Sequence, residues 1–187
     1  MKQTLKSRVK KLLNLIRGEQ SLDKLIKKGL VIGKNHKIMS GCIIDPSHCW
    51  HITIGDDVAM APRVHILAHD ASTKHYLNYT KVANVKIGNR VFIGAGSIVL
   101  PGVVIGDDVV IGAGSVVSKD IPSNVVAAGT PAKVICKLDE YVEKEKMQMN
   151  EQNVFGEEYT FRNPLFNEEQ RSKMKNVCEK TGKIYVK

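Results

Sequence analysis

Aromatic residues are scarce in this chain of 187 residues. Phenylalanine, tyrosine and tryptophan together make up 5% of the sequence, although 43% of it is hydrophobic. The apolar positions are filled mainly by isoleucine, valine, leucine and alanine. A chain with enough apolar residues for a real core but so few rings is expected to have a narrow interior.

Paired cysteines and long apolar runs are also missing. The sequence has four cysteines, and none of them forms a Cys-x-x-Cys pair: Cys42, Cys49, Cys136 and Cys178. No stretch approaches the ~20 apolar residues that a membrane span needs, and the basic N-terminus is not followed by a signal-peptide pattern. We therefore expect a cytoplasmic protein with reduced thiols.

The charge is strongly basic, with a net charge of +9 and a pI near 9.4. Lysine and arginine concentrate towards the two ends of the sequence. This balance permits an anionic partner such as a nucleic acid, a membrane surface or a small anionic ligand. No motif that reads RNA or DNA accompanies the charge, so we expect no nucleic-acid partner.

A period of six residues dominates the stretch from Ile87 to Val117. Aliphatic residues recur at every sixth position: Ile87, Ile93, Val99, Ile105, Ile111 and Val117. This period fits neither an α-helix nor a flat strand with alternating faces. It predicts a parallel β-helix in which the aliphatic side chains of successive coils stack. A β-sandwich is the alternative, but its strands recur at intervals of about 8–12 residues.

The six-residue phase is interrupted twice. The insertion PSHCWHIT separates Ile44 from Ile54, and the polar segment 67–84 shows no period of its own. Loops of such length in compact domains are usually functional. We predict an N-terminal amphipathic helical segment (1–29), a β-helix (30–136) from which loop 67–84 projects, and a C-terminal helical extension (137–187).

The N-terminal segment contains a helical pattern over residues 4–17. Its apolar residues share one face, opposite lysines and arginines: Leu5, Val9, Leu12, Leu13 and Ile16. Such a helix could lie on a membrane surface. We expect instead that it covers the open end of the solenoid, because solenoid ends need caps. A second short helix is predicted between Ser21 as N-cap and Gly29 as stop.

Three stretches carry a resemblance to a known family: IGDDVAMAPRVHI, the AHD that opens loop 67–84, and VKIGNRVFIGAGSIVLPGVVIGDDVVIGAGSVVSKDIPSNVVAAGTPAKVI. Over residues 30–137 the chain resembles the hexapeptide-repeat acyltransferases. Among them it is most similar to the galactoside, maltose and capsular-polysaccharide O-acetyltransferases. The resemblance implies an all-β solenoid, namely a left-handed parallel β-helix, a homotrimer with sites between subunits, and acetyl-CoA as donor.

His69 is the candidate catalytic base. A hydroxyl is a poor nucleophile until its proton is removed, and histidine is the side chain suited to remove it near neutral pH. In the family the catalytic histidine opens the projecting loop, and His69 matches that position, whereas His75 matches no motif. Asp70 is a candidate for substrate binding, for holding the loop or for orienting the ring.

The candidate coenzyme A residues come from the resemblance. It implies that Ala95 and Ala113, in the two Gly-Ala-Gly turns, line the pantetheine groove and that Ser118 lies near its far end. Phe92 stands where family members often carry tryptophan. Lys133, in TPAKVI, matches a basic position that meets a coenzyme A phosphate, although lysine lacks the planar fork of arginine.

The acceptor is expected to be a saccharide. Trp50, Tyr76 and Tyr79 lie in the two interruptions, and aromatic rings stack on sugars, although the same rings could pack at a subunit interface. We therefore predict an acetyl-CoA-dependent O-acetyltransferase that acts on a hydroxyl of a sugar or glycan precursor. The transfer is direct, with a histidine base.

Three alternatives remain. The acceptor could be serine or an antibiotic of the chloramphenicol or streptogramin type. The chain could instead be a metal-dependent protein that resembles the γ-type carbonic anhydrases, with His65, His69 and His75 as candidate ligands. It could also be a non-catalytic scaffold. The GAGS and TPAKVI motifs favour coenzyme A, so no metal is expected.

Overall fold

The computed structural model describes residues 21–187. The helix predicted over residues 4–17 lies outside them. The chain divides into two compact units, with the boundary between Asp139 and Glu140.

Very short strands build the first unit. They are β1 (Val31–Ile32), β2 (Lys37–Ile38), β3 (Ile43–Ile44), β4 (Ile52–Ile54), β5 (Ala59–Met60), β6 (His65–Ile66), β9 (Val85–Ile87), β10 (Phe92–Ile93), β11 (Ile98–Val99), β12 (Val104–Ile105), β13 (Val109–Ile111), β14 (Val116–Val117), β15 (Val125–Gly129) and β16 (Ala132–Lys137). Most of them are two or three residues long, because a turn follows each inward aliphatic residue.

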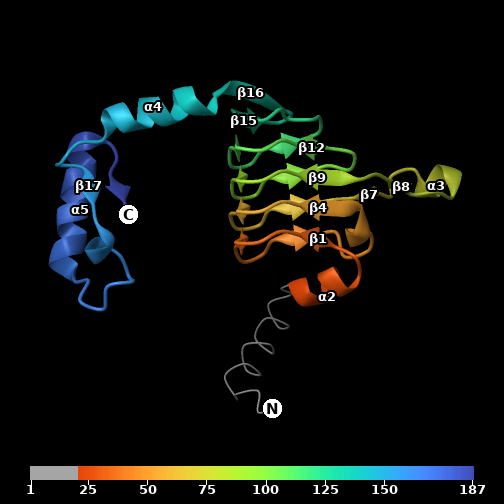
Figure 1. The fold of residues 1–187 in the computed structure, drawn as a ribbon, viewed down its shortest axis with the longest axis horizontal. Coiled ribbons are helices and arrows are strands. Elements are labelled where there is room, and N and C mark those ends of the chain that lie inside the picture. The colour runs from red at the N-terminus through yellow and green to blue at the C-terminus, as the bar shows by residue number, and fades with distance from the viewer. Residues whose placement is uncertain (1–20) are drawn as a thin grey trace, which may run out of the picture. The chain divides into compact units, whose positions relative to one another are not determined.

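These strands form three sheets that the chain visits in turn. The strand orders are β1-β4-β9-β12, β2-β5-β10-β13-β15-β16 and β3-β6-β11-β14. Pairing within them is parallel, except that β16 runs antiparallel to β15. The coils stack in register, so that Met60, Ile93 and Ile111 form one column. Figure 1 shows the coils from the side, with β1, β4, β9 and β12 stacked one above another. This arrangement is consistent with a hexapeptide β-helix.

The aliphatic residues of the repeat form the core. The six that were identified by their period are at most 1% exposed: Ile87, Ile93, Val99, Ile105, Ile111 and Val117. The residues that precede them on the strands point outwards, as Phe92 and Val104 do at 45% and 42% exposure. The pattern of burial therefore follows the six-residue period from Ile87 to Val117, and the three-residue strands β4, β9 and β13 each bury a second aliphatic side chain.

A short helix precedes the sheets. Helix α2 (Leu22–Lys27) begins after Ser21, whose side chain makes no capping hydrogen bond. The chain leaves the helix through Gly29, which has a φ of +107°, a conformation that costs glycine little. Leu25 joins the core of the first unit. The predicted helix is thus present, although Ser21 does not cap it as expected.

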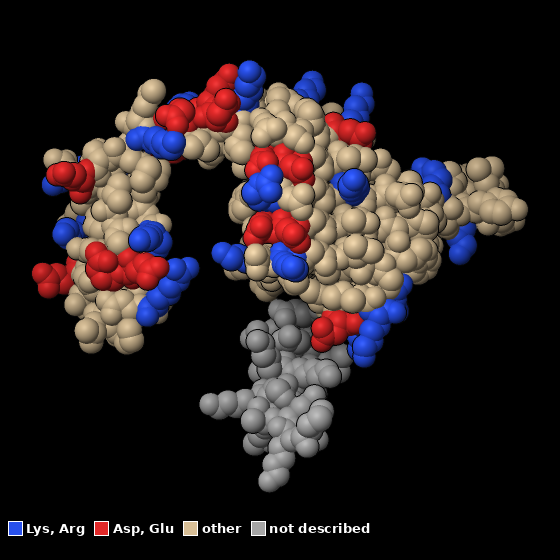
Figure 2. Space-filling view, in the orientation of Figure 1, with Lys and Arg blue, Asp and Glu red and all other residues tan. Residues whose placement is uncertain are grey.

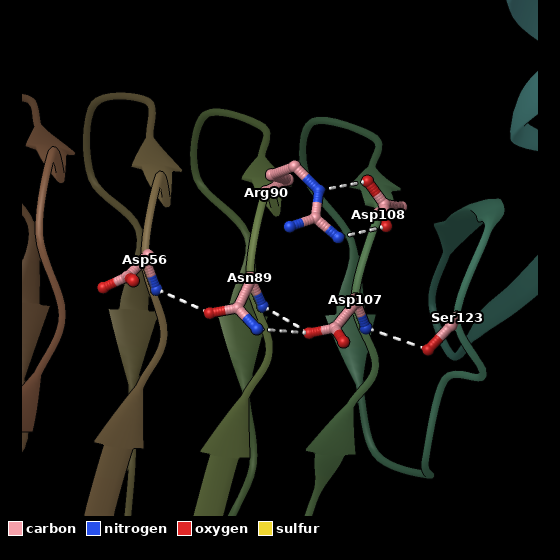
Figure 3. A network of polar contacts seen from close by, with 6 residues as sticks. All are labelled: Asp56, Asn89, Arg90, Asp107, Asp108 and Ser123. Carbon is pink, nitrogen blue, oxygen red and sulfur yellow. Dashed lines mark hydrogen bonds and ion pairs between the residues drawn. The ribbon is translucent and has the colours of Figure 1, made fainter.

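A ladder of polar side chains connects successive coils at one corner (Figure 3). The backbone amide of Asp56 donates to Oδ1 of Asn89 at 2.9 Å, and the amide and Nδ2 of Asn89 both donate to Oδ1 of Asp107 at 2.6 and 3.0 Å. The amide of Asp107 in turn donates to Oγ of Ser123 at 2.9 Å. Side chains of each next coil thus satisfy amides that the short strands leave unpaired.

Charges of both signs are interspersed on the face of the first unit that is visible in Figure 2. Arg90 donates from Nε and Nη2 to the two carboxylate oxygens of Asp108, at 2.7 and 2.6 Å, and this pair lowers the pKa of Asp108. This face therefore offers no continuous basic surface to a nucleic-acid backbone. Among residues 21–187, no helix is long and apolar enough to cross a membrane.

Segment 67–84 extends away from the three sheets (Figure 1). It contains β7 (His69–Asp70), α3 (Lys74–Leu77) and β8 (Lys81–Val82). The two strands pair antiparallel, His69 with Val82 and Asp70 with Lys81. The segment forms a two-stranded hairpin, and its strands are too short to give the sequence a period.

The second unit contains most of α4 (Leu138–Gln148), then β17 (Val154–Phe155), the 3₁₀ helix η2 (Glu157–Tyr159), α5 (Glu168–Thr181) and β18 (Tyr185–Val186). Glu145 on α4 accepts hydrogen bonds from Lys183 Nζ at 2.6 Å and from the Tyr185 hydroxyl at 2.9 Å. Helix α5 begins at Asn167, which forms a reciprocal capping box with Gln170.

Candidate active site

His69 opens strand β7, and its imidazole is held by a carboxylate from another coil. Nδ1 of His69 is hydrogen bonded to Oδ2 of Asp45. Asp45 directly follows β3, in which Ile44 pairs with Ile66 of β6. This register brings Asp45 beside the segment that leads from β6 to His69, although the two residues are 24 positions apart.

Asp45 is completely buried, at 0% exposure. Besides His69, its carboxylate accepts hydrogen bonds from the amides of Ala68, Ser47 and His48 at 3.0, 3.0 and 3.1 Å. Burial is the largest influence and raises the pKa of Asp45, but these hydrogen bonds together outweigh it and leave the pKa below its usual value. A charged Asp45 therefore fixes the imidazole, and Nε2 is the nitrogen left to take a proton.

The insertion between Ile44 and Ile54 folds against His69. It forms a 3₁₀ turn, η1 (Cys49–His51), preceded by His48. The His48 ring centroid lies 4.8 Å from that of His69 and 5.3 Å from that of Trp50. Trp50 itself is 53% exposed. The insertion thus places a second imidazole next to the candidate base and an accessible indole next to that second imidazole.

The two interruptions of the repeat meet at this point. Nδ1 of His51, in the first interruption, lies 2.7 Å from Oδ1 of Asn84, the last residue of the second. His69 is part of the second interruption, and its side chain is 31% exposed. The candidate site therefore consists of residues from both insertions together with Asp45, which follows β3.

The other predicted loop residues lie farther along the hairpin. Asp70 pairs with Lys81 Nζ at 2.6 Å and accepts a hydrogen bond from the Ser72 amide at 2.8 Å, so its contacts hold the hairpin and the ring of His69 is oriented by Asp45. Tyr76 and Tyr79 are 82% and 77% exposed. The structure thus places Trp50 beside His48, the ring neighbour of His69, and leaves the two tyrosines open to solvent.

The two Gly-Ala-Gly turns lie on successive coils. The amide of Gly114 donates to the carbonyl of Ala95 at 2.8 Å. A Cβ atom added to Gly94 would lie 2.4 Å from the backbone nitrogen of Ala113, so a side chain cannot be accommodated there. Ala95 and Ala113 are both exposed. The structure therefore brings these two predicted groove residues together along one corner.

The remaining predicted coenzyme A residues lie elsewhere on the first unit. Phe92, on β10, and Lys133, on β16, belong to the same sheet. Ser118 directly follows β14, and the register of β14, β11, β6 and β3 places it at the same corner as Asp45, on a later coil. Within one chain, Phe92 and Lys133 therefore lie on the sheet whose strands β10 and β13 lead into the two Gly-Ala-Gly turns, whereas Ser118 lies at a second corner.

A hollow of about 520 Å³ lies at the corner that carries Ala95. It is lined by Ser40, Gly41, Pro62, Arg63, Ala95 and Gly96. Arg63 brings a guanidinium to this hollow, and such a group suits phosphate recognition. Sequence reasoning missed Arg63, although it lies in the quoted stretch IGDDVAMAPRVHI, one coil before the first Gly-Ala-Gly turn.

Sequence reasoning also did not identify Asp45 and His48 as candidate site residues. Both lie where the six-residue phase first fails, and an acidic residue at the end of a buried strand was the available signal. Within residues 21–187, Asp45, His48 and His69 are the group whose possible metal-ligand atoms all lie within 4.8 Å of one another. His65 and His75, the partners of His69 in the metal-dependent alternative, do not belong to this group.

Known proteins match the repeat and, in one case, about three quarters of the chain. The family described as bacterial transferase hexapeptide (six repeats) matches residues 84–119. Protein CapG of Staphylococcus aureus is 38% identical over 159 residues, which cover 76% of this chain and 91% of that protein. The galactoside O-acetyltransferase of Escherichia coli K12 is 46% identical over 94 residues, covering 49% of this chain and 46% of that enzyme.

One solved structure of a similar protein contains acetyl-CoA. The hexapeptide-repeat acetyltransferase VCA0836 of Vibrio cholerae, complexed with acetyl-CoA, is 28% identical, with a TM-score of 0.53 and coverage of 59% of this chain and 61% of that one. The chain thus spans most of CapG but only about half of the galactoside enzyme. The chain belongs to the hexapeptide-repeat acetyltransferases.

Proposed function

We propose that this protein transfers an acetyl group from acetyl-CoA to a hydroxyl of a sugar or glycan precursor. The observation that carries the proposal is the half-buried imidazole of His69, which the buried carboxylate of Asp45 holds in place. An acetyl-CoA complex of one relative and the galactoside O-acetyltransferase activity named for another support the donor and the type of acceptor.

Nε2 of His69 removes the proton from the acceptor hydroxyl, and the hydroxyl oxygen attacks the thioester carbonyl of acetyl-CoA. Asp45 stabilises the imidazolium that forms. The tetrahedral intermediate then collapses, the C–S bond breaks, and the imidazolium returns the proton to the sulfur of coenzyme A. Backbone N–H groups stabilise the oxyanion in this scheme.

Direct transfer is favoured because Cys42 and Cys49 in the first unit are poorly placed as nucleophiles. Burial is the largest influence on Cys42 and raises the pKa of its thiol, and its Sγ donates to the Ala61 carbonyl at 3.1 Å. Cys49 is completely buried. A thiol that is kept protonated or enclosed reacts slowly.

The donor site is proposed to lie between subunits of a homotrimer of left-handed β-helices. Ala95 and Ala113 would form one wall of the pantetheine groove, with Phe92 and Ser118 along its course. Arg63 and Lys133 would supply positive charge for the phosphates. On a single chain, Ser118 and His69 lie at a different corner from the two alanines, which supports a site that a neighbouring subunit completes.

Release of free thiol from acetyl-CoA tests the proposal with a panel of sugars, serine and chloramphenicol as acceptors. On the best acceptor, His69→Ala should lower kcat/KM by about 10²–10⁴-fold, the usual contribution of a general base. The matched control is His75→Ala, an exposed histidine of the same hairpin, which should stay within about twofold of wild type. Full turnover by His69→Ala would show that the base is another group.

A further inference from the structure

The histidine next to the candidate base has no role in the reaction proposed above. Nδ1 of His48 is buried and has no hydrogen-bond partner within residues 21–187. A buried polar atom without a hydrogen-bond partner destabilises a fold, so the unpaired nitrogen of His48 indicates a binding site for a ligand. The carboxylate of Asp45 and the imidazole of His69 lie nearby. One potential metal-ligand atom from each of Asp45, His48 and His69 lies within 4.8 Å of the other two.

We propose that Asp45, His48 and His69 bind a divalent transition-metal ion such as Zn²⁺, and that the bound ion inhibits acetyl transfer. The inhibitory part of this inference rests on the proposed function, whereas the binding part does not. Carboxylate oxygen and imidazole nitrogen are common zinc ligands, and sites with three protein ligands leave a fourth position for water.

Asp45 suits a ligand role because it is already fixed and charged. The amides of Ser47, His48 and Ala68 hold its carboxylate from behind. Hydrogen bonds of this kind orient the ligands of metal sites, and the lowered pKa keeps the carboxylate ionised at neutral pH. No proton therefore has to leave Asp45 when a cation binds.

The two histidines approach from different elements. His48 precedes the 3₁₀ turn η1, and His69 lies on β7, with the rings tilted by 41°. Zinc–ligand distances are about 2.0–2.2 Å, so the three ligand atoms must move closer together than in the present arrangement. Rotation of the two imidazoles about their side-chain bonds would achieve this without a change in the strands.

Inhibition follows from the chemistry of imidazole. A neutral ring that coordinates a metal through one nitrogen carries its proton on the other. If the ion binds Nδ1 of His69, Nε2 is protonated and cannot accept the acceptor's proton. If the ion binds Nε2, the base itself is occupied. In both cases the ion also competes for Asp45, so metal binding and base catalysis exclude each other.

The binding test uses the full-length protein, freed of metal by a chelator and titrated with ZnCl₂ by calorimetry. We expect one high-affinity Zn²⁺ per chain, and a loss of affinity of about tenfold or more in His48→Gln. The matched control is His75→Gln, which should bind like wild type because His75 is outside the group. Thermal unfolding of His48→Gln checks that the fold is retained.

The activity test adds Zn²⁺ to wild type and to His48→Gln. Wild-type turnover should fall as the site fills and should return with EDTA, and His48→Gln should need a correspondingly higher Zn²⁺ concentration. No saturable binding, or equal binding by His48→Gln, would overturn the site. Zinc that binds without inhibition, or that raises turnover, would overturn the inhibitory role. If no acceptor is acetylated, the proposed function fails, and the calorimetric result still decides the metal site.

Discussion

At the scale of single residues, the pair formed by Asp45 and His69 shows how stacked parallel strands can build a polar site. Strand pairing places the two residues on adjacent coils, and burial of the carboxylate is compensated by three amide hydrogen bonds. We infer that Asp45 is a positioning residue: it contacts His69 and holds the ring for the reaction without touching the substrate.

Replacing Asp45 by asparagine should therefore act on the chemical step. We expect kcat of Asp45→Asn to fall by about 10²-fold, a typical share for assisted proton transfer, while KM for acetyl-CoA stays within about threefold. Steady-state kinetics with the best acceptor measure both values. Asp108→Asn, which loses only the outer pair with Arg90, serves as the control. A rise in KM with unchanged kcat would contradict the positioning role.

Asn89 has a different task, because it connects three coils at one corner (Figure 3). Asn89→Ala leaves the Asp56 amide without its acceptor and should lower the free energy of unfolding by about 1–2 kcal/mol. Urea denaturation at a fixed protein concentration measures the change. Arg90→Ala, on the same turn, removes a surface ion pair and should cost at most about 1 kcal/mol. Equal losses in the two variants would argue against the ladder.

At the scale of elements, the hairpin β7–β8 carries His69 and is held at its base by the Asp70–Lys81 pair. The hydrogen bond from Lys81 lowers the pKa of Asp70 to about 2. The folded pKa lies below the usual value, so the contribution of Asp70 to stability is complete above about pH 4 and is lost as the pH falls towards 2.

The pair is exposed, so its effect on stability should be small. We expect the melting temperature of wild type to exceed that of Asp70→Asn slightly at pH 6, and the difference to disappear near pH 2. Thermal unfolding followed by circular dichroism at a series of pH values measures it. A difference that does not change with pH would mean that the carboxylate charge of Asp70 contributes nothing to the hairpin.

At the scale of the whole molecule, the two compact units differ in what they offer. The first unit carries the repeat, both interruptions and every candidate site residue, whereas the second contains none of them. On a single chain, His69 and the corner of Ala95 and Ala113 lie on different parts of the first unit. A trimer with shared sites would combine His69 of one subunit with the groove of the next.

Mixed trimers test this arrangement. His69→Ala lacks the base, and Ala113→Phe should block the pantetheine groove, so each variant alone should be inactive. When the two are denatured and refolded together, some interfaces would combine an intact histidine with an intact groove. We expect partial recovery of acetyl transfer, together with a mass about three times 20.7 kDa by light scattering. An absence of recovery from mixed oligomers of that mass would place each site within one subunit.

The sequence alone was sufficient for the repeat and for the base candidate. The six-residue spacing from Ile87 to Val117 reports burial directly, because each coil contributes aliphatic residues at fixed intervals along the chain. His69 was singled out because it lies in the segment where that spacing fails and because AHD resembles the family motif in which the catalytic histidine opens the projecting loop. Both signals depend on residues that are close together in the sequence, so they can be recognised without a structure.

Only the tertiary structure identified the partners of His69. Asp45 is remote in sequence and becomes its neighbour through the register of β3 and β6. His48 and Trp50 join them because the first insertion folds over the second. Stacking of the coils brings residues that are distant in sequence into direct contact. The six-residue period does not indicate which interruptions of the repeat will lie next to each other.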